Sequence, residues 1–266
     1  MLSGQITALA DLPPPRRKKV PQNVVKTEKY PIYYQPITKC GCTFLRHLMF
    51  CFDNGAPFRD AEGVLHPAYD GDNSAGEVPP NVIRDTEATF VVIRDPVDRF
   101  MSLYFDKFVC ADGDKPHREV FRYADDAGSL IYPGTDIETN RSNCHLILDH
   151  IASTLDDWPY KKANWHWKPQ VVRMRAIRDL RFKTLTLDGL NWQLPLVLDK
   201  VVPSLADATK TVKIRNPSPK FLTAEEVLDQ PLRDRILRLY PLDTAMYQQV
   251  HAYWANHAAN PERSAA

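Results

Sequence analysis

The segment 88-ATFVVIRDPVDRFMSLYFDKF-108 constrains the fold of this chain more than any other. Its apolar run over residues 89–93 is short and continuous, as is typical of a strand covered on both faces. Asp95 then offers an N-cap, and Pro96 fits the first position of a helix. One face of that helix carries Phe100, Leu103, Tyr104 and Phe108. The segment therefore predicts a buried strand, a turn and a helix.

The segment 38-TKCGCTFLRHLMF-50 predicts the same order of elements. Before it, residues 30–34 (YPIYY) supply β-type side chains, and Pro31 and Pro36 favour an edge or an end of a strand. After it, apolar residues recur at helical spacing, at Phe44, Leu45, Leu48, Met49 and Phe52. Lys39 therefore lies in a second strand-to-helix turn.

Strands and helices alternate along the rest of the chain. The pattern predicts loops over residues 53–80, a helix over 143–155, a strand over 181–187, a helix that starts at Pro195, a helix over 223–239 with a capping box at Thr223 and Glu226, and a last helix after Pro241. This alternation predicts an α/β fold with a largely parallel sheet. We expect a disordered leader over residues 1–29, one domain over 30–257 and a disordered tail over 258–266.

Composition excludes several classes of function. Of the 266 residues, 34 are Lys or Arg and 33 are Asp or Glu, so the net charge indicates no nucleic-acid partner. No apolar stretch approaches the roughly 18 residues of a membrane span, and the first residues lack the apolar core of a secretory signal. The five cysteines and eight histidines complete no zinc pattern. We therefore expect a cytoplasmic protein with reduced thiols and no metal, and the sequence does not indicate its oligomeric state.

The turn around Lys39 has the composition of an anion site. A strand-to-helix turn leaves backbone N–H groups at the positive end of the helix dipole. Gly41 permits close approach of the chain, Thr43 can donate its hydroxyl and Lys39 adds a positive charge. A solvent-facing turn with an incidental lysine is the alternative interpretation.

The turn after residue 93 offers a second anion site. Arg94 ends the buried strand, and Ser102 lies roughly two helical turns further on. Arg94 either forms an ion pair with Asp95 or Asp98, or it binds a phosphate. If both turns bind phosphate, they predict a ligand with phosphates at two places.

Three segments together carry a family resemblance. TKCGCTFLR resembles the phosphosulfate-binding loop of sulfotransferases, and FVVIRDPVDRFMSLYFDKF resembles their 3′-phosphate-binding segment. The segment 166-HWKPQ-170 is similar to the His-Trp-x-Pro-Gln signature of the carbohydrate sulfotransferases (sulfotransferase family 2). FKTLTLDGL and YPLDTAMY follow it as they do in that branch, so the resemblance runs from Tyr33 to about Trp254.

The resemblance implies a P-loop-NTPase-like α/β fold that binds 3′-phosphoadenosine-5′-phosphosulfate as co-substrate, without a metal. The residues implied are Lys39, Cys40, Gly41, Cys42, Thr43 and Phe44 at the 5′-phosphosulfate, and Arg94 and Ser102 at the 3′-phosphate. The implied reaction is sulfuryl transfer to a hydroxyl of an acceptor, with a carbohydrate favoured. The chain departs from the family at Thr38, where proline is usual, and lacks the membrane anchor of Golgi relatives, which implies a bacterial-type cytoplasmic enzyme.

A general base for the acceptor hydroxyl is expected among the histidines. In related sulfotransferases the base commonly lies between the two nucleotide-binding segments, and His66 is the one histidine in residues 50–108. We expect His66 to be the base and His166, in the HWKPQ signature, to hold the acceptor or the helix beside it; a surface or packing role is the alternative for each. Trp165 and Trp167 can stack on a pyranose or pack in the core.

Two other functions share such a loop. A P-loop kinase or NTPase is disfavoured because G-x-x-x-x-G-K-[ST] is absent and the lysine precedes the glycine. A catalytically inactive nucleotide-binding protein of the same fold is disfavoured by the joint presence of Lys39, Arg94 and Ser102.

Overall fold

The computed structural model describes a defined part of the chain, in two compact units. The described residues are 24–55, 88–108, 136–155, 160, 163–174, 177, 182–199, 201–206, 209 and 222–259. Unit 1 comprises residues 1–94, 170–215 and 245–266, and unit 2 comprises residues 95–169 and 216–244. His66 and most of the predicted loop stretch, from residue 56 to 80, lie outside the described residues.

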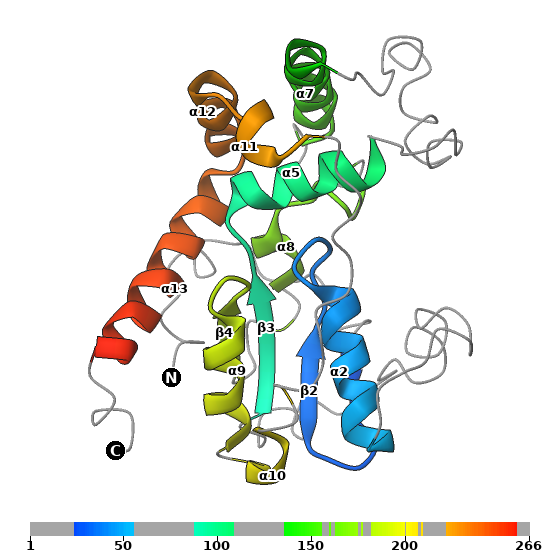
Figure 1. Cartoon of the computed structure of the whole chain (residues 1–266), viewed down its shortest axis with the longest axis vertical. Helices are drawn as coiled ribbons and strands as arrows, with labels where there is room; N and C mark the ends of the chain where they lie inside the picture. Colours follow the sequence, from blue (N-terminus) through cyan, green and yellow to red (C-terminus); the bar gives the residue numbers. More distant parts are fainter. Residues whose placement is uncertain are drawn as a thin grey trace. The chain divides into compact units, whose positions relative to one another are not determined.

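Unit 1 contains a sheet with the order β1-β2-β3-β4. Its strands are β1 (Val25–Lys26), β2 (Ile32–Gln35), β3 (Ala88–Ile93) and β4 (Lys183–Thr186). β2, β3 and β4 are mutually parallel and β1 is antiparallel to β2, so the predicted α/β class with a mostly parallel sheet is confirmed. The arrows of β2 and β3 point the same way in Figure 1. β1 lies before Tyr30, where we expected order to begin. Sequence reasoning did not predict this strand, because two residues carry no periodicity.

The helices of unit 1 surround this sheet. They are α2 (Cys42–Asn54), α8 (Gln170–Met174), α9 (Leu190–Asp199), α10 (Pro203–Ala206) and the greater part of α13 (Pro241–Ala259). All six residues of β3 are buried, as expected for a parallel strand covered on both faces. The ring of Tyr34 on β2 stacks on Phe90 of β3 with 5.3 Å between centroids. Trp254 of α13 donates from its indole nitrogen to the Thr184 carbonyl at 2.8 Å.

Unit 2 is helical in its described residues. It contains α5 (Pro96–Lys107), α7 (Ile137–Thr154), α11 (Ala224–Val227), α12 (Gln230–Leu239) and the start of α13, and α5, α7, α11 and α12 are labelled close together in Figure 1. Its core gathers Phe100, Leu103, Ile147, Ile151, Leu232 and Ile236. The buried Tyr104 hydroxyl donates to Asn140 Oδ1 at 2.6 Å. No described helix of either unit is long and apolar enough to cross a membrane.

Local capping rules predicted two helix starts correctly. The Asp95 carboxylate accepts from the N–H groups of Val97 and Asp98 at 2.8 and 3.2 Å, and α5 begins at Pro96 as predicted. The predicted capping box is also present, because Thr223 and Glu226 bond each other's backbone N–H.

Three other helix boundaries differ from prediction. α9 begins at Leu190 instead of Pro195, because the Gln193 side chain bonds the Thr186 backbone N–H and hydroxyl at 2.8 and 3.0 Å and anchors an earlier start. α7 begins at Ile137 instead of residue 143, because Asp136 caps the helix by accepting from the Thr139 backbone N–H. The helix predicted over 223–239 divides into α11 and α12. Asp229 is the N-cap of α12, and its carboxylate accepts from the Leu232 backbone N–H.

Candidate functional site

The loop between β2 and α2 has an unusual backbone. Lys39 has φ 66°, and Gly41, the N-cap of α2, has φ 77° and ψ 21°, so both are left-handed with Cys40 between them. Left-handed residues in a turn can direct backbone N–H groups toward an anion. The Cys40 N–H already donates to the Ile37 carbonyl at 3.2 Å, so the N–H groups further along the loop are the candidates for such a contact. A left-handed residue other than glycine costs about 1–2 kcal/mol, so the surrounding structure must impose this conformation on Lys39.

Gly41 is required at its position for two reasons. Its positive φ is one that side chains disfavour. A Cβ atom added there would also lie 2.8 Å from Cδ1 of Leu187, which follows β4. A larger residue would therefore strain the backbone and clash with Leu187.

The N-terminus of α2 is open. No side chain caps it, and its first turn contains no acidic residue. Leu45 donates the first bond of the helix, to the Gly41 carbonyl at 3.0 Å, so the N–H groups of Cys42, Thr43 and Phe44 have no acceptor within the helix. Free N–H groups at the positive end of a helix dipole favour a bound anion.

The thiols of the loop point back into the protein. Cys40 is fully buried, and its Sγ donates to Gln170 Oε1 at 3.2 Å. Cys42 Sγ donates to the Ile37 carbonyl at 2.8 Å and accepts from the Tyr34 hydroxyl at 3.4 Å. Burial, with the Cys42 thiol beside it, raises the pKa of Tyr34, so the phenol remains a neutral donor. The sulfur atoms of the loop are therefore engaged by contacts within the protein.

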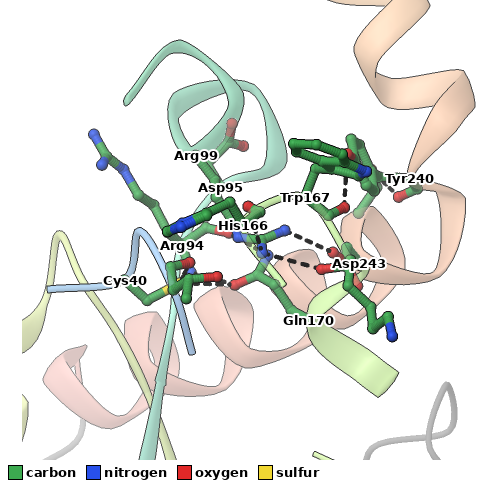
Figure 2. A network of polar contacts seen from close by, with 12 residues as sticks. Cys40, Arg94, Asp95, Arg99, His166, Trp167, Gln170, Tyr240 and Asp243 are labelled. Carbon is green, nitrogen blue, oxygen red and sulfur yellow. Dashed lines mark hydrogen bonds and ion pairs between the residues drawn. The ribbon is translucent and has the colours of Figure 1, made fainter. Parts of the chain in front are cut away.

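Arg94 lies directly after β3 and close to this loop. Its guanidinium Nη1 donates to the Lys39 carbonyl at 3.4 Å. Gln170 holds both of its backbone groups: the Arg94 N–H donates to Gln170 Oε1 at 2.9 Å, and Gln170 Nε2 donates to the Arg94 carbonyl at 2.8 Å (Figure 2). No ion pair of Arg94 with Asp95 or Asp98 is found in the described part of the chain. Unit 1 thus brings Arg94 together with the loop.

Ser102 and His166 belong to unit 2. Ser102 is half-buried on α5, whose N-terminus is already closed by the Asp95 carboxylate. His166 is half-buried, and its backbone N–H donates to Asn164 Oδ1 at 2.9 Å. It lines a small hollow together with Pro96, Arg99, Phe100, Leu103, Trp167 and Tyr240. The hollow encloses about 10 Å³, which is roughly the space that one water molecule requires, so it is too small to hold an acceptor by itself.

Arg99 organises the HWKPQ segment, and sequence reasoning did not identify it. It is almost fully buried, and its Nη2 donates to the carbonyls of His166 and Lys168 at 3.2 and 3.0 Å. Its Nη1 lies 4.0 Å from the Asp243 carboxylate, and Figure 2 labels both residues. The sequence did contain one signal for this role of Arg99: it is an arginine on the apolar face of α5, where a helix normally packs.

The two tryptophans have different environments. Trp167 is buried, donates from its indole nitrogen to Thr154 Oγ1 at 3.1 Å and accepts at its carbonyl from the Tyr240 hydroxyl at 2.9 Å. It is therefore a core residue. Trp165 is 54% exposed, and the Lys168 ammonium lies over one face of its ring, 4.4 Å from the ring centre.

Histidines other than His66 and His166 have packing or surface contacts where described. His150 packs edge-on against Trp167, and burial lowers its pKa. His145 lies 3.1 Å from Arg235 Nη1, and His251 lies 3.8 Å from Asp188. Each of these contacts is a packing or surface contact of the histidine concerned.

Comparison with known families gives one match. The family model described as "Sulfotransferase family" matches residues 22–176, which include both strand-to-helix turns and the HWKPQ segment. No curated protein and no solved structure matches the chain.

Proposed function

Because the chain belongs to the sulfotransferase family, we propose that it transfers a sulfuryl group from 3′-phosphoadenosine-5′-phosphosulfate to an acceptor hydroxyl. The observation that carries this proposal is the open N-terminus of α2, preceded by left-handed Lys39 and Gly41. The phosphosulfate is a compact anion, and the loop offers backbone N–H groups, a hydroxyl and a positive charge for it.

Lys39 is proposed to act on the leaving group. Sulfuryl transfer, like phosphoryl transfer, requires an in-line nucleophile and stabilisation of the charge that develops on the departing phosphate. Lys39, with its left-handed backbone, belongs to the same loop that supplies the N–H groups. Thr43 and the backbone from Cys40 to Phe44 are proposed to hold the same phosphosulfate.

The 3′-phosphate is proposed to bind Arg94 and Ser102. The contact of Arg94 with the Lys39 carbonyl places its guanidinium beside the proposed phosphosulfate loop. The N-terminus of α5 is capped by Asp95, so side chains rather than that helix end would supply the contacts. The assignment of Ser102 rests on the family resemblance.

The acceptor and its base complete the proposal. We propose a carbohydrate hydroxyl as nucleophile, with the exposed ring of Trp165 as a stacking surface for a sugar. His66 is proposed as the general base and His166 as a residue that holds the acceptor. A general base contributes about 10²–10⁴-fold in rate, so His66→Ala should lose that much kcat with nearly unchanged affinity for adenosine 3′,5′-bisphosphate. An active His66→Ala and an inactive His166→Ala would exchange the two roles.

The remaining features of the proposal follow from the resemblance. We propose a P-loop-NTPase-like arrangement of the fold, a bacterial-type cytoplasmic enzyme, and a reaction without a metal. The division of the chain into leader, single domain and tail also stays a prediction.

Two measurements separate this function from its alternatives. A thermal-shift comparison of adenosine 3′,5′-bisphosphate with ATP and magnesium should show a larger stabilisation by the bisphosphate, because ligand that binds only the folded state raises Tm. Preferential stabilisation by ATP would favour a kinase-like phosphotransferase. Transfer of label from the donor to an acceptor in a host extract would separate an enzyme from an inactive binding protein and identify the acceptor.

A further inference from the structure

The side chain of Gln170 connects the two proposed anion-binding elements of unit 1. Gln170 is fully buried and is the first residue of α8. Its carboxamide oxygen accepts from the Arg94 N–H at 2.9 Å and from Cys40 Sγ at 3.2 Å. Its carboxamide nitrogen donates to the Arg94 carbonyl at 2.8 Å. One buried amide therefore contacts both the strand end and the loop (Figure 2).

These contacts require an amide in one orientation. The oxygen faces two donors and the nitrogen faces a carbonyl, so a flipped amide would place N–H against N–H and oxygen against oxygen. Glutamate accepts but does not donate when ionised, and methionine of similar length does neither. The standard side chain that provides both functions at this length is glutamine.

The amide acts where the sheet no longer fixes the chain. The last pair of residues in the β3–β4 register is Ile93 with Thr186, and Arg94 lies one residue beyond it. Gln170 bonds both backbone groups of Arg94, as a neighbouring strand would. The direction in which the Arg94 side chain leaves the backbone is therefore set by a side chain that lies far away in the sequence.

The other end of this connection is the loop. Cys40 lies between left-handed Lys39 and Gly41, and the Arg94 guanidinium contacts the Lys39 carbonyl. Gln170, Arg94 and the loop thus form a closed set of contacts within unit 1. A change in the amide would alter the position of Arg94 relative to the loop.

We propose that Gln170 is a positioning residue that sets the spacing between the 3′-phosphate contact at Arg94 and the 5′-phosphosulfate loop. This inference rests on the proposed function. Gln170 touches neither phosphate in this proposal; it makes the two contacts simultaneously available to one nucleotide. Gln170 should therefore raise the affinity for a nucleotide with both phosphates more than the affinity for a nucleotide with one.

Calorimetric titration with three nucleotides tests the proposal. The probes are adenosine 3′,5′-bisphosphate, adenosine 5′-phosphate and adenosine 3′-phosphate, and the variant is Gln170→Met. Misplacement of Arg94 should weaken its charge-assisted hydrogen bond to the 3′-phosphate, so bisphosphate affinity should fall on the order of ten- to a hundredfold. The two monophosphates should lose at most a few-fold.

Gln193→Met is the matched control. Gln193 is also buried, and its amide also bonds a strand end, at Thr186. Gln193→Met should lower Tm about as much as Gln170→Met does, but it should leave the ratio of bisphosphate to monophosphate affinity unchanged. An equal loss of that ratio in both variants would show a general effect of destabilisation and would overturn the proposal.

A double-mutant cycle provides the second readout. In an Arg94→Ala background, Gln170→Met should have much less effect on bisphosphate affinity, because residues that act through one another are not additive. Additive losses would overturn the positioning role. If Gln170→Met does not fold, Cys40→Ala removes the contact between the amide and the loop, together with the contact of Cys40 Sγ with the Thr38 carbonyl at 3.7 Å. It should lower bisphosphate affinity several-fold, and Cys40→Ser should recover part of the loss.

The wild-type titration separates failure of this inference from failure of the proposed function. Wild-type protein that does not bind the bisphosphate would overturn both. Wild-type binding, with unchanged bisphosphate preference in folded Gln170→Met or Cys40→Ala, would overturn the positioning role alone.

Discussion

The helices α2 and α5 each follow a buried parallel strand, but their N-termini are built in opposite ways. α5 is preceded by Asp95, whose carboxylate caps the helix, and Asp98 adds an acidic residue to its first turn. α2 is preceded by Gly41, which has no side chain to cap the helix, and the first turn of α2 contains no acidic residue. The turn before α2 contains two left-handed residues, whereas none is found at Arg94 or Asp95.

This difference separates a helix end that stabilises the fold from one that is available to a ligand. At α5 the chain supplies its own carboxylate, so the N–H groups are satisfied without a ligand. At α2 the N–H groups and the positive end of the dipole are left to an external anion. We therefore propose that these two similar strand-turn-helix segments differ in function according to the residue at the N-cap.

The largest expected effect comes from making α2 resemble α5. Thr43→Asp places a carboxylate in the first turn of α2, where two like charges about 4 Å apart repel by roughly 4 kcal/mol at an effective dielectric constant of 20. Affinity for adenosine 3′,5′-bisphosphate should fall about a hundredfold or more. Stability should rise by about 0.3–1 kcal/mol, because the helix dipole favours an acid there. Thr43→Asn is the neutral control for titration and denaturation, and equal binding by the two variants would contradict an open anion site.

Removing the Arg94 side chain tests whether the strand end before α5 contributes to nucleotide binding through that side chain. Arg94→Ala should weaken bisphosphate binding by about 1.5–3 kcal/mol, the range of charge-assisted hydrogen bonds. Adenosine 5′-phosphate should be affected little, because it lacks the 3′-phosphate. Calorimetry with both nucleotides measures the difference, and equal losses would remove Arg94 from the 3′-phosphate site.

Substitution of Lys39 separates its charge from its backbone strain. Lys39→Ala and Lys39→Gly both remove the ammonium, so both should lower kcat far more than they raise the donor KM. Glycine accepts the positive φ, so Lys39→Gly should be more stable than Lys39→Ala by about 1 kcal/mol in thermal denaturation. A loss confined to KM would make Lys39 a ground-state contact, and equal stability of the variants would indicate that the strain is absent.

The smallest effect is expected at the cap of α5. Asp95→Ala should destabilise the protein by about 1 kcal/mol, and Asp95→Asn should retain most of the stability, since asparagine also caps well. Chemical denaturation measures both. A fall in stability for Asp95→Asn as large as for Asp95→Ala would indicate that the charge, rather than the cap, closes this end.

Sequence reasoning predicted the parts of the fold that local rules control. The N-cap at Asp95, the apolar run of β3 and the turn at Lys39 could all be identified from neighbouring residues. The early start of α9 could not, because it depends on a side-chain contact between Gln193 and Thr186. The bonds from Gln170 to Arg94 and from Arg99 to the carbonyl of His166 join residues from distant parts of the chain, and no periodicity reveals them.

The left-handed conformation of Lys39 has a consequence for engineering this protein. A procedure that optimises thermal stability alone would favour glycine at position 39, since most natural proteins carry such unoptimised positions. That choice would delete the charge proposed to assist the leaving group. Selection for heat resistance and selection for turnover should therefore diverge at this residue, and a library screened for both would identify position 39 as one where stability is given up for activity.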